Sequence, residues 1–171
     1  MRVDALQDTA PAALSLDDFD ALYEAYYQPV YRAVRSIVLD AGIAEDVTQN
    51  TFMKAYRKRD LYRPIGTVGG WLHKIAVREA ISALRWRSLH DRLLGAIKLK
   101  ASLPLPDNTL GGLLTQVLQE LRPGTRAALV LHYFHGYRYR EVADILQIPE
   151  GTVATRISNG LKKMRTIIDR E

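Results

Sequence analysis

The sequence of 171 residues contains no cysteine, which excludes disulfide bonds and thiolate metal sites. Its histidines do not have the spacing of a metal-binding motif either. No stretch approaches the roughly 18 consecutive apolar residues that span a bilayer, and the N-terminal segment lacks a basic stretch followed by an apolar one. We therefore expect a cytoplasmic protein with no cofactor, no bound metal and no direct membrane insertion.

Motifs of catalysis are lacking as well. The sequence has no P-loop, no nucleophile elbow and no HExxH zinc motif, and it offers no paired carboxylates flanking a cleft. The glycines of residues 66–70 (GTVGG) do not have the spacing of a phosphate-binding loop. These absences disfavour an enzyme, including one that modifies nucleic acids, and we expect no small-molecule substrate.

Hydrophobic residues recur at helical spacing along most of the chain, and no strand-like alternation of useful length is present. Residues 103–108 (LPLPDN) interrupt the pattern, because two prolines remove backbone donors and favour extended geometry before them. The pattern predicts an all-α fold of two small helical domains joined by a flexible linker. The expected division is a disordered tail at 1–14, a first domain at 15–92, the linker at 93–112 and a second domain at 113–171.

Helix boundaries follow from capping and turn-forming residues. In the first domain we expect a helix that starts near Ser15 and is kinked or split by Pro29, and it ends at the sequence Asp40-Ala41-Gly42. Two more helices are expected at about 44–58 and 68–88. In the second domain, a helix with residues 113–121 precedes one that carries Phe134 on its inner face, and the last two helices are expected at about 139–146 and 152–168.

Charge is distributed unevenly. Residues 1–28 carry six acidic side chains and one basic, whereas residues 54–100 carry twelve basic and three acidic. The basic block suits a polyanion partner such as nucleic acid, and attraction to phosphates would make binding depend on salt. A solvated basic face without a partner explains the charge alone equally well.

Residues 139–161 (YREVADILQIPEGTVATRISNGL) have the layout of a helix-turn-helix, with two short helices joined by a tight turn. Apolar side chains of the two helices can pack together and leave the polar face of the second for a DNA major groove. Arg156 is the strongest candidate, because arginine can donate two hydrogen bonds to guanine. Gln147 occupies a turn position that glycine would suit better. The candidate DNA contacts are Arg138, Arg140, Thr152, Thr155, Arg156 and Asn159. A packed hairpin with a solvated polar face is the simpler alternative.

Together with residues 128–146 (ALVLHYFHGYRYREVADIL), this motif resembles the C-terminal domain of bacterial extracytoplasmic-function (ECF) sigma factors. Three earlier segments resemble the N-terminal domain of that family in the same order. These segments are 19–34 (FDALYEAYYQPVYRAV), 44–58 (AEDVTQNTFMKAYRK) and 69–87 (GGWLHKIAVREAISALRWR). The resemblance covers residues 17–171 apart from the linker.

The resemblance implies a transcription initiation factor that binds RNA polymerase core and promoter DNA, and that an anti-sigma factor often holds inactive. The second helix lies where the family contacts the polymerase clamp, and the implied core-binding residues are Asp46, Gln49 and Asn50. The third helix and its preceding loop lie where the family captures the unwound minus-ten strand, and the implied contacts are Tyr62, Arg63, Lys74, Arg78 and Arg85. The helix-turn-helix would read the minus-thirty-five element. Trp71 fits a core role better than stacking on DNA. The apolar residues Leu93, Leu94, Ile97 and Leu99 fit either an anti-sigma contact or an extension of the third helix's core.

The third helix departs from the family pattern, which reads close to WLFRIARNLAIDRLRRR. Here Arg78 stands for the asparagine, Glu79 for an apolar residue and Ser82 for the aspartate. We therefore expect an unusual minus-ten preference.

A stand-alone helix-turn-helix regulator is the alternative function. It would explain residues 113–171 but would leave the basic block and the helix of Asp46 unexplained. Binding to RNA polymerase core distinguishes the two functions.

Overall fold

The structure is a computed structural model, and it describes residues 18–62, 67–93 and 109–169. All regular secondary structure within these ranges is helical, so the all-α prediction is confirmed. Several predictions lie outside the described residues: those on the tail, on Ser15, on Arg63 and on the linker residues Leu94, Ile97 and Leu99.

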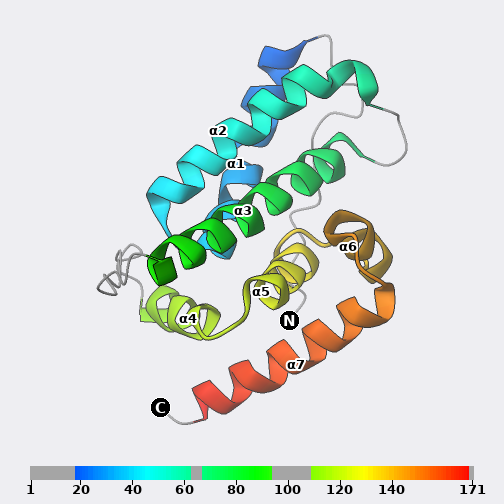
Figure 1. Cartoon of the computed structure of the whole chain (residues 1–171). Helices are drawn as coiled ribbons and strands as arrows, with labels where there is room; N and C mark the ends of the chain where they lie inside the picture. Colours follow the sequence, from blue (N-terminus) through cyan, green and yellow to red (C-terminus); the bar gives the residue numbers. More distant parts are fainter. Residues whose placement is uncertain (1–17, 63–66, 94–108, 170–171) are drawn as a thin grey trace.

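The first part of the chain forms three long helices, which we call the N-terminal bundle (Figure 1). They are α1 (Phe19–Val38), α2 (Ala41–Lys58) and α3 (Val68–Leu93), and a short 3-10 helix, η1 (Arg59–Leu61), follows α2. Apolar side chains at helical spacing form the core of this bundle. The fully buried ones include Leu22, Val30, Val34, Ile37, Leu72 and Val77. Burial of side chains of this size contributes about 1.5–3 kcal/mol each.

Aspartate caps set the starts of α1 and α2. The carboxylate of Asp18 accepts a hydrogen bond from the Ala21 amide at 3.1 Å, and Asp40 accepts one from the Ile43 amide at 3.0 Å. The prediction that Asp40-Ala41-Gly42 ends the first helix is wrong, because α1 ends at Val38 and Asp40 caps the next helix. Helix α2 therefore begins earlier than predicted. Leu39 is the C-cap of α1 and has a left-handed conformation.

Pro29 lies inside α1, which continues through it as one helix, so the predicted split does not occur. A proline removes one backbone hydrogen bond and costs about 3 kcal/mol in a helix interior. Helix α1 packs along both α2 and α3 and buries residues before and after Pro29, including Tyr26 and Val30. Tertiary packing thus offsets the local cost of the proline.

The second part forms what we call the C-terminal bundle. It consists of α4 (Thr109–Gln119), α5 (Pro123–Leu129), a π-helical turn η2 (Val130–Phe134), α6 (Tyr139–Leu146) and α7 (Glu150–Ile168). Helix α6 has its predicted bounds, whereas α7 begins two residues before the predicted Thr152. Phe134 was expected on an inner face, but its side chain is 51% exposed. The π turn explains the error, because its wider winding shifts the residues after Val130 out of the 3.6-residue period.

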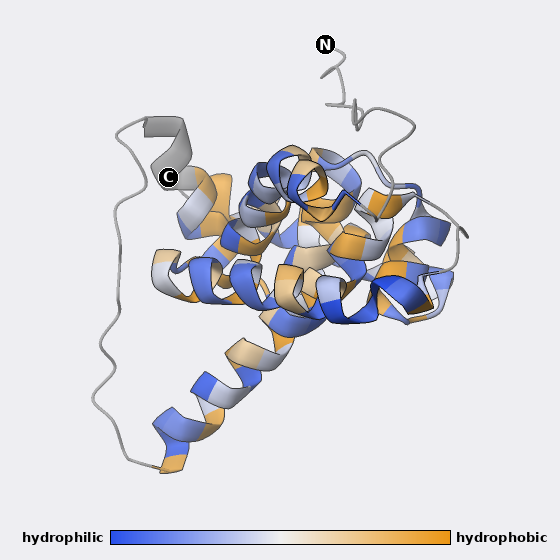
Figure 2. Cartoon of the chain, turned by 90° about the horizontal axis from the view of Figure 1, so that it is seen from above, coloured by the Kyte–Doolittle hydropathy of each residue, from blue (hydrophilic) through white to orange (hydrophobic). Residues whose placement is uncertain are grey.

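The two bundles pack against each other. Helix α3 contacts α5 and α6, and α1 contacts α5 and η2 (Figure 1). Their buried side chains form one continuous hydrophobic cluster. The last turns of α3 project beyond the body of the molecule (Figure 2), where Trp86 and Leu93 are exposed. Among the described residues, no helix is long and apolar enough to cross a membrane.

Candidate nucleic-acid interface

One face of α2 carries the predicted polymerase contacts. Asp46, Gln49 and Asn50 are all exposed, whereas Val47 and Thr48 between them are buried. The helix period therefore brings the three predicted side chains to one surface.

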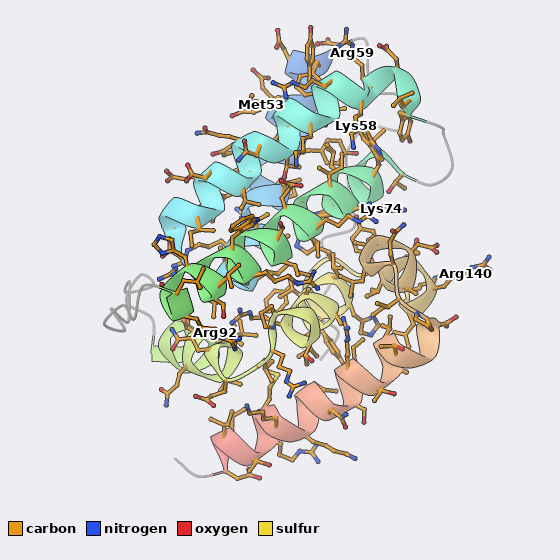
Figure 3. The ribbon with its side chains drawn as sticks, in the orientation of Figure 1. Met53, Lys58, Arg59, Lys74, Arg92 and Arg140 are labelled. Atoms are coloured by element: carbon orange, nitrogen blue, oxygen red, sulfur yellow. The ribbon has the colours of Figure 1, made fainter. Side chains whose placement is uncertain are left out.

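Sequence reasoning missed a member of this face. Met53 follows Gln49 and Asn50 at helical spacing, is 52% exposed, and points outward from α2 (Figure 3). An exposed methionine is a flexible apolar group that adapts to a partner surface. The sequence signal that could have identified Met53 was its helical spacing from Asn50, which places both side chains on the same face of α2.

Glu79 departs from the family pattern, and its contact explains why a charge is tolerated there. Its carboxylate lies 2.6 Å from the ammonium of Lys54 and so joins α3 to α2. Both side chains are partly exposed, so the pair contributes modestly to stability. Glu79 therefore helps to hold α3 against α2 within the N-terminal bundle.

The helix-turn-helix forms as predicted. The backbone amide of Arg138 donates to the Glu141 carboxylate at 2.7 Å and starts α6. Gln147 ends α6 with φ of 54°, in the left-handed region where glycine is more comfortable. Val153 and Ile157 on α7 are buried in the core of the C-terminal bundle, whereas Thr155 and Asn159 on its polar side are exposed.

The candidate contacts of the helix-turn-helix separate into two groups. Thr152, Thr155, Arg156 and Asn159 all line a cleft of about 950 Å³ between α7, α5 and α3. Arg138 and Arg140 are exposed at the start of α6, do not line this cleft, and Arg140 points away from the molecule (Figure 3).

Arg156 is turned toward its own bundle in this structure. Its guanidinium packs over Gly124, where a Cβ would come within 2.7 Å of Nη1, and it lies 3.5 Å from the Gly124 carbonyl oxygen. The hydroxyl of Thr155 donates to the Gly151 carbonyl at 2.9 Å. The Arg156 guanidinium is thus held against the N-terminal turn of α5 within the C-terminal bundle.

The predicted cations of α3 face the C-terminal bundle. Arg85 lines the same cleft as Arg156, and the Arg78 guanidinium donates to the side-chain oxygen of Gln147. Lys74 extends from the same helix toward α6 (Figure 3). The three residues are spaced to share one face of α3, so both predicted DNA-binding helices turn their polar faces toward each other.

Of the predicted base-capture residues the structure describes Tyr62, which follows η1 and packs beside the start of α3. The ring of Tyr62 lies 5.1 Å from that of Trp71, and Trp71 is partly buried against the hydrophobic core. Trp71 therefore has the core role that the sequence favoured, and it supports Tyr62.

The cleft is strongly basic. Its charged lining consists of Arg85, Arg92, Arg122, Arg156, Lys163 and one carboxylate, Glu120. Glu120 lies 3.7 Å from Lys163 and neutralises only part of the charge. An excess of cations with hydroxyl and amide groups beside them suits the phosphates of nucleic acid.

Two histidines lie where the bundles meet. Burial, reinforced by the neighbouring His135, lowers the pKa of His73 to about 3. Burial and the charge of Arg32 lower the pKa of His135 to about 4. Both side chains are therefore neutral near pH 7, and neither adds to the positive charge of the cleft.

Two helical bundles that present cationic helices, the second through a helix-turn-helix, define a DNA-binding protein. Residues 22–89 match the family Sigma-70 region 2, and residues 112–164 match Sigma-70, region 4. The RNA polymerase sigma-H factor of Pseudomonas aeruginosa is 30% identical, over 81% of this chain and 80% of that protein. The ECF RNA polymerase sigma factor SigE of Mycolicibacterium smegmatis is 31% identical, over 94% of this chain and 65% of that protein. The chain belongs to the ECF sigma factors of the sigma-70 family.

The fold is also similar to that of the Bartonella quintana sigma factor RpoE, solved in complex with the anti-sigma factor NepR. The TM-score is 0.79 with 22% identity, over 90% of this chain and 98% of that chain. At this identity the likeness concerns the fold alone.

Proposed function

We propose that this chain binds RNA polymerase core through the exposed face of α2 and directs it to promoters. In this role α3 and the loop before it hold the unwound minus-ten strand, and the helix-turn-helix reads the minus-thirty-five element. The role requires no catalytic group on the chain and operates in the cytoplasm, with polymerase. An anti-sigma factor is a further partner of the kind that the solved complex of RpoE contains.

The observation that supports the proposal is the presence, in one chain, of two cation-bearing helices, α3 and α7, and a separate exposed polar face on α2. The α2 face of Asp46, Gln49, Asn50 and Met53 is exposed on the N-terminal bundle, whereas the cations of α3 and α7 line the basic cleft. A stand-alone regulator would bind DNA through α7, but it would leave the exposed face of α2 and the cations of α3 without a function. The matches to both sigma regions and the names of the relatives favour the sigma factor.

Transcription in vitro with purified core polymerase, with and without the chain, tests the proposal directly. We expect run-off transcripts from the cognate promoter only when both are present. Co-purification of the chain with core polymerase is expected as well, because a regulator would bind duplex DNA alone. Failure to associate with core polymerase, even without any inhibitor, would contradict the proposal.

Substitutions separate the two surfaces. Asp46→Ala should weaken association with core polymerase, whereas Glu24→Ala, on an exposed position of α1, is the matched control. Arg156→Ala should leave core binding unchanged and cost about 1–3 kcal/mol of promoter binding, with relaxed discrimination at one base. Arg85→Ala should weaken strand opening. It should also reduce by about one the slope of the logarithm of the binding constant against the logarithm of salt concentration, because one phosphate contact is lost.

A further inference from the structure

The basic end of α2 has no role in the function proposed so far. Arg57, Lys58 and Arg59 are consecutive cations, and Asp60 is the only acidic residue of the segment 54–62. Among the described residues, none of these three cations forms an ion pair. Cations in the last turn of a helix interact favourably with its carbonyl groups, but this effect does not depend on where the side chains lie.

The Arg59 side chain is held over the ring of Tyr56. The guanidinium carbon lies 4.1 Å from the ring centroid, and Nη1 donates to the Tyr56 carbonyl oxygen at 2.8 Å. The Tyr56 ring is itself supported by an edge-to-face contact with Phe19, with ring centroids 5.1 Å apart. Tyr56 is 49% exposed, so this Tyr56–Arg59 stack lies at the surface. A ligand that binds the guanidinium plane therefore does not have to immobilise a free arginine side chain.

The Tyr56–Arg59 stack is joined to the predicted base-capture residue Tyr62 by the 3-10 helix η1. The Tyr62 amide donates to the Arg59 carbonyl at 3.1 Å. Residues three apart in a 3-10 helix eclipse each other, so Arg59 and Tyr62 leave the turn on the same side. The ring of Tyr62 lies 5.1 Å from that of Trp71. This end of the N-terminal bundle therefore presents two planar groups, each beside an aromatic ring.

Lys58 adds a cation beside these planar groups. It follows Lys54 by four residues, and Lys54 pairs with Glu79 of α3, so Lys58 lies on the side of α2 that faces α3. Lys58 is exposed, and both Lys58 and Arg59 lie toward the end of α2 (Figure 3). Planar groups for stacking together with cations for phosphates are the combination that binds single-stranded nucleic acid.

The order of the elements gives the direction of the bound strand. The chain leaves α3 at Leu93 toward the helix-turn-helix, which reads the upstream element in the proposed function. The opposite end of the N-terminal bundle, where α2 ends and α3 begins (Figure 1), therefore faces downstream. Arg59 and Lys58 lie at this downstream end.

We propose that the Tyr56–Arg59 stack and Lys58 bind the nontemplate strand directly downstream of the minus-ten element, with one base on the guanidinium and a phosphate at the ammonium of Lys58. This contact rests on the proposed function, because it extends the path of the strand that α3 and its preceding loop hold. The exposed residues Asp18 and Asp20 flank Phe19 beside the stack, so stacking rather than phosphate attraction contributes most of the affinity at Arg59. The contact tolerates any sequence, because every base has a face that can stack.

Binding of single-stranded oligonucleotides to the chain with saturating core polymerase tests the proposal. One fluorescent nontemplate oligonucleotide ends at the minus-ten element, a second continues downstream by a few nucleotides, and a third carries abasic nucleotides in this extension. Arg59→Ala removes the planar group, whereas Arg59→Lys removes it but keeps the charge. Arg57→Ala is the matched control, because Arg57 is exposed in the same turn but follows Met53 by four residues and so lies on another side of α2.

We expect the extension to tighten binding of the parent about tenfold, which corresponds to the stacking of one base. The abasic extension should tighten it less. Arg59→Ala and Arg59→Lys should bind the short oligonucleotide as the parent does, and should gain no more from the extension with bases than from the abasic one. Arg57→Ala should match the parent with all three oligonucleotides. A role of Arg59 in folding alone would instead weaken binding of the short and the extended oligonucleotide equally.

The same gain from the extension in Arg59→Ala and in the parent would overturn the proposal. Loss of core binding in Arg59→Ala with an unchanged gain would also overturn it, and would assign the stack to a contact with polymerase. Run-off transcription is measured in parallel, and transcription by the parent without any dependence of the gain on Arg59 would refute the strand contact alone.

A chain that does not associate with core polymerase would refute the proposed function. The oligonucleotides are then titrated against the chain alone. A gain that Arg59→Ala abolishes would keep the stack as a single-strand site, and the absence of such a gain would remove it.

Discussion

Two histidines at the contact between the bundles, His73 and His135, should make stability fall as the pH is lowered from 8 to 5. Burial lowers the pKa of His73 from 6.5 to about 3 and that of His135 to about 4, with smaller contributions from His135 and Arg32 respectively. In the unfolded chain both side chains return to a pKa of about 6.5. Between that value and the lower values, the unfolded chain binds more protons than the folded one. Stability is therefore complete above pH 6.5 and declines as the pH falls through this window.

The loss of stability at pH 5 is nearly the same for any folded-state pKa well below 5, because the ring is then neutral in the folded chain. A histidine that is neutral when folded and has its usual pKa when unfolded loses about 2 kcal/mol of stability at pH 5. His73 is 4% exposed and should contribute in full, whereas His135 is partly exposed and should contribute less. The expected loss of about 3 kcal/mol is large beside the roughly 5–15 kcal/mol that stabilise a typical domain.

Denaturant unfolding followed by circular dichroism at pH 8 and pH 5 measures this loss. His73→Gln keeps a hydrogen-bonding side chain but removes the titrating ring, and it should reduce the loss by about 2 kcal/mol. His90→Gln, which removes an exposed histidine from α3, is the control and should behave as the parent. If His73→Gln loses as much stability between pH 8 and pH 5 as the parent does, protonation of this buried ring is not the cause.

Three further predictions concern packing, capping and charge. Gly160→Ala should destabilise the fold by about 1–3 kcal/mol in thermal unfolding, because the added Cβ would lie 2.8 Å from Cδ1 of Leu129; Gly151→Ala, with no atom within 4 Å, should be neutral or stabilising. Asp40→Ala removes the cap on the Ile43 amide and should cost about 0.5–2 kcal/mol in denaturant unfolding. Added salt should weaken the binding of promoter DNA in a filter-binding assay, because it screens the attraction between the cations of the cleft and the DNA phosphates.

Local patterns were sufficient for most of the secondary structure. The family resemblance indicated Asp46, Gln49 and Asn50, which the helix period brings to one exposed face, and the turn residues predicted the bounds of α6. The errors arose where one residue type serves two purposes. Asp40 was assigned to a helix end, although an aspartate is equally suited to start a helix by accepting the Ile43 amide.

The sequence could not predict the cleft, because nothing local specifies which face of α3 meets α7. Periodicity places Arg85 and Arg156 on polar faces of separate helices, and only tertiary packing brings those faces together. The π turn was also unpredictable, since its i→i+5 hydrogen bonds leave no compositional signal in a short segment. The positions of Phe134 and His135 depend on that turn.

Two residues that depart from the local pattern, Arg78 and Gln147, are explained only by the three-dimensional structure. Arg78 stands on α3 where the family resemblance leads one to expect asparagine, and Gln147 occupies a left-handed turn position. Neither substitution helps its own helix: the arginine adds a cation to a basic surface, and the glutamine strains the turn. Their side chains meet across the bundle contact, 69 residues apart in sequence. Positions that break a local rule are expected at functional or strained sites, and here the two side chains that do so hydrogen-bond to each other across the contact between the bundles.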